Sequence, residues 1–227
     1  MILTQKSRKP DCDVKRKLLL PDKSETNFEV IRYLTSRGID SDVIKACIDE
    51  GLLYESLPYH NCIFVGFDET GNAAYAFYRA TTGERLMGEA AGSDKRYSFR
   101  IDRAGSTLHV FESAIDLLSY ATIMKMRTGE WRAEPMLSLG GVYAPSTNNK
   151  QTKLPIALEK MTQNQTQINT IALHLDNDYA GRSATRSISE QLGNKYIVRD
   201  EPPAYGKDCN DYLQQLQRQK RKRQMER

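Results

Sequence analysis

The stretch "IALHLDNDYAGRSA", residues 171–184, sets the architecture of the second half of the chain. It opens as an apolar run of strand length and then places Asp176 and Asp178 one residue apart, shortly before a glycine. Two carboxylates at this spacing repel each other, and burial makes the charged form of each more costly. A positive group is therefore expected beside them, and the flanking sequence indicates which kind.

Short apolar segments alternate with amphipathic segments throughout this half of the chain. Strand patterns are expected at residues 107–111, 135–141, 170–178 and 195–200. Helical patterns are expected at residues 112–126, 155–164 and 180–192. Strands that alternate with helices predict parallel βαβ units with right-handed crossovers. The expected fold class is therefore α/β, with a parallel sheet flanked by helices.

A smaller α+β domain is expected in front of this sheet. Helical patterns near residues 27–38 and 40–51 each end on a glycine, which is typical of a helix C-cap. Residues 62–79 have the pattern of a β-hairpin around the turn "ETGN". We place the domain boundary near residue 105, within "DRAGS". The expected division is a basic flexible arm at 1–24, the α+β domain at 25–105, the parallel-sheet domain at 106–215 and a basic tail at 216–227.

The composition is that of a globular protein, because 39% of the 227 residues are hydrophobic and 27% are charged. No apolar run has the length of a membrane span, and the first residues lack the apolar core of a signal peptide. A cytoplasmic protein without a membrane partner is therefore expected. The four cysteines have no zinc-site spacing and are expected to be free thiols.

Charge is distributed unevenly along the chain, whose net charge is +4. Residues 1–23 carry +4 and residues 212–227 carry +5, so the remaining residues sum to −5. Basic ends on an acidic body are typical of arms that contact a polyanion. Solvated, disordered ends are the open alternative.

Acidic residues follow the expected strands of the parallel sheet. In such a sheet, ligands bind at the carboxyl ends of the strands. Glu112 follows the first strand, with Asp116 one helical turn later, and a Gly-Gly pair follows the second strand. The third strand leads to the paired aspartates and the fourth to "KDCNDYL". We therefore expect five carboxylates to meet at one edge, namely Glu112, Asp116, Asp176, Asp178 and Asp208.

A cluster of carboxylate oxygens without histidine or thiolate suits Mg²⁺, with Mn²⁺ as a substitute. Sites of this kind hold one or two ions against phosphate oxygens for displacement at phosphorus. Each motif alone is common in unrelated proteins. Their order, each after a predicted strand, is more specific than any one of them.

The segments "VFESAIDLLS", "LSLGG", "LHLDNDYAGRSA" and "KDCNDYL" resemble the TOPRIM domain of bacterial primases, topoisomerases and some nucleases. The resemblance covers about residues 105–215 and is strongest for primases. It implies that Glu112 is the general acid/base, supported by Asp116. It also implies metal ligands, namely Asp176, Asp178 and Asp208.

The first half of the chain resembles the segment that precedes TOPRIM in primases, through "YLTSRGID", "IFVGFDETGNAAYAFYRA" and "GSDKRYSF". It is also similar to two-part TOPRIM proteins of plasmids and conjugative transposons. The resemblance implies phosphate or template contacts by Arg79, Lys95, Arg96 and Tyr97. Two further nucleotide-binding candidates lie in the second half, Lys207 and Arg182, the latter with simple solvation as the alternative.

The resemblance departs from a replicative primase in several respects. A zinc ribbon and a helicase-binding domain have no counterpart in the sequence, and Asn210 stands where primases usually have aspartate. The expected function is primase-like nucleotidyl transfer in mobile-element DNA processing, with nucleoside triphosphates, single-stranded DNA and a helicase or relaxase as partners. A TOPRIM nuclease and a non-catalytic DNA-binding accessory are the open alternatives. A glycosyltransferase with an Asp-x-Asp motif leaves Glu112 and the Lys207–Asp208 pair unexplained.

Overall fold

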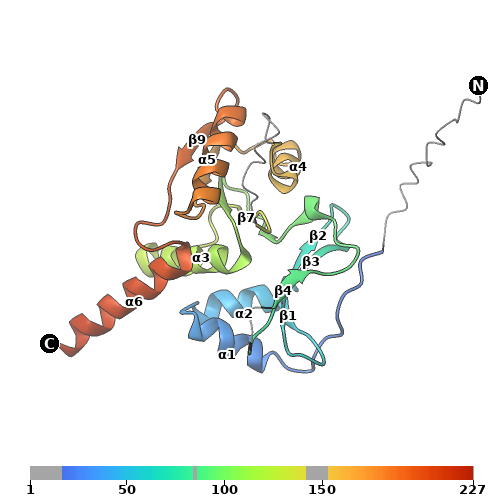
Figure 1. Cartoon of the computed structure of the whole chain (residues 1–227), viewed down its shortest axis with the longest axis vertical. Helices are drawn as coiled ribbons and strands as arrows, with labels where there is room; N and C mark the ends of the chain where they lie inside the picture. Colours follow the sequence, from blue (N-terminus) through green and yellow to red (C-terminus); the bar gives the residue numbers. More distant parts are fainter. Residues whose placement is uncertain (1–16, 84–85, 142–152, 227) are drawn as a thin grey trace, which may run out of the picture.

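The computed structural model describes residues 17–83, 86–141 and 153–226. Within these residues the chain forms two β-sheets, one of four strands and one of five, with helices packed around both (Figure 1). The expected α/β fold with a smaller α+β part in front of it is confirmed. Residues 1–16 of the expected basic arm lie outside the described residues. None of the described helices is apolar over a length that could cross a membrane.

The larger sheet has the strand order β5-β7-β6-β8-β9. Its parallel strands are β6 (Thr107–Phe111), β7 (Met136–Ser138), β8 (Thr170–Leu173) and β9 (Ile197–Asp200). Strand β5 (Arg100–Ile101) pairs antiparallel with β7 at the edge. The four strands expected from the sequence are all present, in parallel pairing. Strand β5 thus belongs to this sheet although it precedes residue 105 in the chain.

Helices cover both faces of the larger sheet. They are α3 (Ala114–Thr128), α4 (Ile156–Asn164), α5 (Tyr179–Leu192) and α6 (Cys209–Met225). Alternating side chains of β6 divide between two cores: Leu108 and Val110 pack with α4 and α5, and Phe111 packs with α3 and α6. This two-residue period is what an extended strand between two helix layers requires. The sheet therefore presents its strand ends, not its faces, to ligands.

The smaller sheet is antiparallel and has the order β1-β2-β3-β4. Its strands are β1 (Leu53–Glu55), β2 (Cys62–Phe67), β3 (Ala73–Arg79) and β4 (Met87–Glu89), and the predicted hairpin is formed by β2 and β3. Helices α1 (Phe28–Ser36) and α2 (Ser41–Asp49) lie below α3 in Figure 1. Val30 and Leu34 of α1 share one buried core with Leu117 and Leu118 of α3. The two halves of the chain are therefore packed against each other, and a site between them has rigid walls.

Two histidines pack against each other in the larger sheet, His109 in β6 and His174 directly after β8. His109 Nδ1 lies 2.8 Å from His174 Nε2, and His174 Nδ1 lies 2.8 Å from the Glu201 carbonyl oxygen. Because a carbonyl only accepts, His174 carries its proton on Nδ1 and accepts from the His109 Nδ1–H. Burial lowers the pKa of His109 to about 4 and that of His174 to about 3. Both rings are therefore neutral in the folded protein near pH 7.

This pair predicts a contribution to the pH dependence of stability that destabilises the folded protein in acid. An unfolded histidine has a pKa of about 6.5, so below that pH the unfolded state takes up protons that the folded state refuses. Each histidine should lower the free energy of unfolding by about 1.4 kcal/mol per pH unit between about pH 6.5 and 4, whereas Glu112 and Asp116, whose pKa values are raised to about 7, contribute slopes of the opposite sign. Urea denaturation of the wild type and of His109→Phe/His174→Phe at pH 7, 6 and 5 isolates the histidine contribution as the difference between the two slopes. This difference should be about 2.8 kcal/mol per pH unit for the two histidines together, and equal slopes would contradict the buried neutral pair.

Candidate active site

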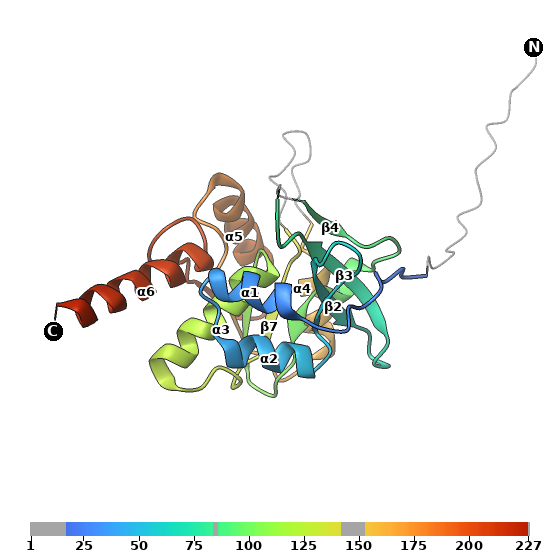
Figure 2. The same cartoon turned by 90° about the horizontal axis from the view of Figure 1, so that it is seen from below.

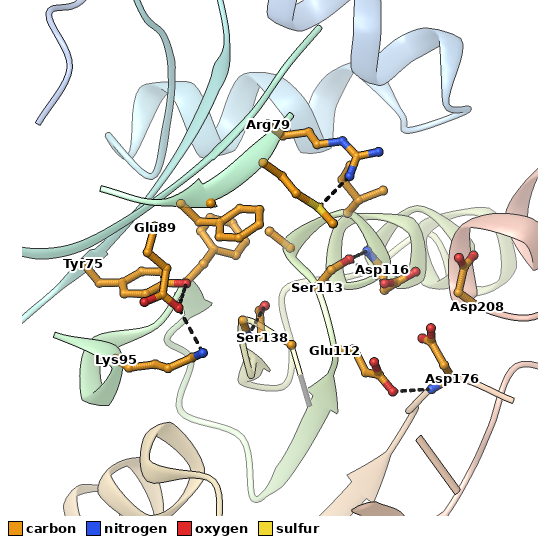
Figure 3. A pocket seen from close by; sticks show the side chains of 18 of the residues that line it. Tyr75, Arg79, Glu89, Lys95, Glu112, Ser113, Asp116, Ser138, Asp176 and Asp208 are labelled. Carbon is orange, nitrogen blue, oxygen red and sulfur yellow. Dashed lines mark hydrogen bonds and ion pairs between the residues drawn. The ribbon is translucent and has the colours of Figure 1, made fainter. Parts of the chain in front are cut away.

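Five acidic residues line one cavity of about 600 Å³ between the two sheets, Glu89 of β4 and four that belong to the second half of the chain (Figure 3). Glu112 directly follows β6, and Asp176 follows β8 after two residues. Asp116 lies in the first turn of α3, and Asp208 is the N-cap of α6. Residues far apart in the sequence therefore meet because the carboxyl ends of parallel strands share one edge of the sheet.

Local capping explains how these carboxylates are held. Ser113 is the N-cap of α3: its Oγ accepts from the Asp116 N–H and donates to Asp116 Oδ2 at 2.5 Å. Asp178 and Asp208 cap α5 and α6, and each accepts from the backbone N–H three residues on. Helix N-termini favour negative charge, so the N-terminal ends of α3, α5 and α6 stabilise the carboxylates of Asp116, Asp178 and Asp208. Capping alone would account for Asp178, which does not line the cavity.

Glu112 and Asp176 touch at the centre of the acidic wall. Glu112 Oε1 accepts from the Asp176 backbone N–H at 3.2 Å (Figure 3). Burial, and then the negative charge of Asp176, raises the pKa of Glu112 to about 7. Burial, and then the charge of Asp208, raises the pKa of Asp116 to about 7. Groups that titrate near neutral pH are suited to general acid/base work.

The positive group beside the paired aspartates is Lys207. Its Nζ lies 3.0 Å from Asp176 Oδ2 and 3.1 Å from Asp178 Oδ2. These hydrogen bonds raise the pKa of Lys207, while burial keeps the pKa of Asp176 above its usual value. The positive group that the sequence required beside Asp176 and Asp178 is therefore the ammonium group of Lys207 in this structure.

The donor set fits a hard divalent cation, although it is not closed around one. Among the described residues, no three His, Cys, Asp or Glu side chains come together in a group that could enclose a metal ion. Four carboxylates from the side of the larger sheet nevertheless line one cavity, and among these four Lys207 pairs with Asp176 alone. Oxygen ligands alone, with surplus negative charge, are what Mg²⁺ requires. Binding it would displace the Lys207 ammonium from the aspartates.

Two of the basic residues singled out in the sequence reach the opposite wall. Arg79 and Lys95 both line the cavity, Arg79 with its Nη1 2.9 Å from Met87 Sδ and Lys95 with its Nζ 3.0 Å from Glu89 Oε1 (Figure 3). The wall opposite the four carboxylates therefore carries Arg79 of β3 and Lys95 of the 3-10 turn Lys95–Tyr97, the latter paired with Glu89 of β4. A ligand with phosphates and a metal ion would match both walls.

The other four basic or aromatic candidates lie outside this lining, namely Lys207, described above, and Arg96, Tyr97 and Arg182. Arg96 pairs with Asp94, and the Tyr97 hydroxyl donates to Glu69 Oε2 at 2.7 Å. Arg182 donates to the carbonyls of Leu175 and Asp176 and pairs with Asp200. Arg182 therefore fixes the backbone around the Asp-x-Asp segment.

Arg37 is a cavity residue that the sequence reasoning missed. It ends α1 within "YLTSRGID", lines the cavity, and its buried Nε finds no hydrogen-bond partner among the described residues. Arg37 Nε and Ser98 Oγ are the buried side-chain atoms of the described residues that lack a hydrogen-bond partner, and an unpaired guanidinium nitrogen facing a cavity favours an anionic ligand there. The sequence feature that could have identified Arg37 is its position directly before Gly38, which ends the helix, within the segment "YLTSRGID" that resembles primases.

Two family models match the chain. Residues 109–213 match the model described as Toprim-like, and residues 32–104 match one described as a protein of unknown function (DUF3991). No curated protein matches the sequence.

Solved structures resemble the chain over most of its length. The primase fragment of the bacteriophage T7 primase-helicase protein has a TM-score of 0.55 at 18% identity, covering 82% of this chain and 72% of that one. The E. coli primase catalytic core has a TM-score of 0.54 at 16% identity, with coverages of 85% and 70%. A DnaG primase catalytic domain bound to ssDNA has a TM-score of 0.54 at 14% identity, with coverages of 85% and 71%. The predicted TOPRIM domain and primase-like fold are confirmed.

Proposed function

We propose that the protein is a Mg²⁺-dependent TOPRIM enzyme that carries out primase-like nucleotidyl transfer on a DNA template. The observation that carries the proposal is the cavity between the two sheets, with Glu112, Asp116, Asp176 and Asp208 on one wall and basic groups on the other. Phosphodiester chemistry needs both a metal-binding wall and a phosphate-binding wall. The primase-like fold supports the same reading.

The residues divide into roles by their position. Asp176, Asp178 and Asp208 would hold Mg²⁺, which when bound stabilises the charge of the transferred phosphoryl group. Arg37, Arg79 and Lys95 bind the nucleotide phosphates from the opposite wall. All three are cavity residues.

Glu112 handles the proton. Its Oε1 is occupied by the Asp176 N–H, which leaves Oε2 to accept the proton of the attacking hydroxyl. A pKa of about 7 lets the group take up and release that proton at neutral pH. Asp116 on α3, whose pKa burial also raises to about 7, is a second group that can take up or release a proton beside the site.

The direct test is synthesis. The protein is incubated with nucleoside triphosphates, Mg²⁺ and a single-stranded DNA template, and short complementary oligonucleotides are expected. The same reaction in EDTA is the control and should give none. Cleavage of the template without nucleotide incorporation would replace the proposal with a nuclease that uses water as the nucleophile at the same carboxylates.

A non-catalytic DNA-binding accessory is the second candidate. The salt bridges from Lys207 to Asp176 and Asp178 favour it, because they leave the acidic wall without a closed metal site. Neither synthesis nor cleavage would then be detected, while DNA is still bound. For the enzyme we further propose plasmid or conjugative-transposon DNA as the setting and a helicase or relaxase as the partner, on the resemblance to two-part mobile-element proteins alone.

Lys207→Met should tighten metal binding by the free protein. The ammonium competes with a cation for two carboxylates, and a partly exposed ion pair of this kind contributes on the order of 1 kcal/mol. Removing it should lower the dissociation constant for Mn²⁺ about fivefold. Mn²⁺ titration followed by electron paramagnetic resonance measures this. Lys160→Met removes a lysine that pairs with Glu69 outside the cavity, and should leave the constant unchanged. Weaker binding in Lys207→Met would mean that the lysine shapes the metal site.

A further inference from the structure

The second half of α6 leaves the body of the protein. Figures 1 and 2 show the helix projecting outward at its C-terminal end. Its first turns are anchored, since Cys209, Asn210 and Leu213 are buried and Gln217 donates to the Gly38 carbonyl. From Arg218 to Glu226 every residue is exposed. Packing therefore explains the first half of the helix and not the second.

This projecting half, residues 218–223, is called the basic arm of α6 below. Five of its six residues are lysine or arginine: Arg218, Lys220, Arg221, Lys222 and Arg223. Cations three or four positions apart face each other on a helix and repel. In the described part of the chain, the acidic group that pairs with the arm is Glu226, 3.9 Å from Lys222. The helix thus holds uncompensated charge that a polyanion would neutralise.

The distribution of charge identifies the kind of partner. The arm carries cations on all sides, and Met225 is the one large apolar side chain exposed near it. A membrane-surface helix needs a broad apolar face, which is missing from this part of α6. A chain of phosphates needs repeated cations and no apolar face. The arm matches the second requirement.

We propose that the basic arm of α6 binds the phosphodiester backbone of a nucleic acid outside the cavity. Asp208, which begins the helix, lines the cavity, so the arm starts about 15 Å from the cavity along the helix axis, at about 1.5 Å per residue. The N-terminal end of α6 then contacts the nucleic acid at the acidic wall, and its C-terminal end contacts the same nucleic acid outside the cavity. The inference does not need the cavity to be catalytic.

The test measures oligonucleotide binding by the full chain as a function of salt, in EDTA and without nucleotides. Fluorescence anisotropy with a single-stranded 20-mer and with its duplex covers both sources of phosphate. In Lys220→Gln/Lys222→Gln/Arg223→Gln, the slope of log affinity against log salt should fall by about 2 for the single strand and about 3 for the duplex. Affinity at low salt should fall at least tenfold.

The control lowers net charge equally at exposed lysines and arginines elsewhere, in Arg32→Gln/Lys45→Gln/Lys195→Gln. It should retain both slope and affinity. An unchanged slope in the arm variant, or an equal loss in the control, overturns the proposal. Tighter binding of the wild-type protein to vesicles of anionic lipid than to the oligonucleotide also overturns the proposal.

Hydrogen exchange tests the proposal independently, because it uses the wild-type protein and therefore needs no substitution. Adding the oligonucleotide to the wild-type protein should slow amide exchange at residues 218–225, because bound phosphates remove the repulsion within the arm. Unaltered exchange there, with binding observed, overturns the proposal. Because the assay requires no turnover, an inactive protein that binds through the arm refutes the proposed enzyme and supports this inference.

Discussion

Glu112→Gln should abolish Mg²⁺-dependent oligonucleotide synthesis while leaving the protein folded and able to bind DNA. The amide keeps an Oε1 that can accept from the Asp176 N–H, so the wall of the cavity is preserved. What is lost is the oxygen that takes the proton. Loss of a positioned general base costs on the order of 10²–10⁴ in rate. Single-turnover assays at saturating nucleotide and template measure the loss.

Stability separates this effect from damage to the fold. Burial raises the pKa of Glu112 to about 7, so above that pH the folded protein carries a charge that the unfolded chain carries more easily. The free energy of unfolding at pH 8 should therefore rise in Glu112→Gln, by about 1–3 kcal/mol. Glu159→Gln makes the same change on the exposed side of α4 and should alter neither activity nor stability. Full activity in Glu112→Gln would remove this residue from the chemistry.

The convergence of the acidic residues was accessible from sequence because one geometric rule controls it. Glu112 and Asp176 each follow a parallel strand, and parallel strands end at one edge. No knowledge of side-chain packing was needed to bring them together. Asp208 could be placed in the same way because its strand, β9, lies beside β8.

The basic groups could not be sorted by the same rule, because their directions depend on local partners. Arg96 turns to Asp94 two residues away, and Tyr97 turns to Glu69 in the turn between β2 and β3. Lys95, their neighbour, reaches the cavity. A sequence motif gives the position of the loop but not which of three consecutive side chains points inward.

The salt bridges from Lys207 were missed for a similar reason. The opening stretch required a positive group beside Asp176 and Asp178, and a divalent ion and a lysine ammonium satisfy that requirement equally. The choice depends on a loop 29 residues further along the chain, counted from Asp178 to Lys207. Its path is fixed by contacts such as that from the Asn177 N–H to the Lys207 carbonyl, at 2.7 Å. Pattern reasoning does not reach this level of detail.

Gly181→Ala should impair both folding and activity, although alanine is the better helix former. Gly181 lies in the first turn of α5, and a Cβ there would lie 2.3 Å from the Asp176 carbonyl oxygen and 2.7 Å from Glu112 Oε1. Helix propensity alone would favour alanine by about 1 kcal/mol. Overpacking against a fixed backbone costs about 1–3 kcal/mol, and here it also separates Glu112 from the Asp176 N–H.

The two consequences of Gly181→Ala can be measured separately. Urea denaturation should show a net loss of up to about 2 kcal/mol, since the gain in helix propensity of about 1 kcal/mol offsets part of the overpacking cost. Oligonucleotide synthesis should fall further, on the order of 10²-fold, because a shift of about 1 Å in a catalytic group is enough for such a loss. Arg186→Ala introduces alanine at an exposed position of the same helix and should retain stability and activity. A Gly181→Ala protein that is more stable and fully active would show that α5 can move away from the end of β8 without moving Glu112. The close approach of Gly181 to Asp176 and Glu112 would then not be what positions the acidic wall.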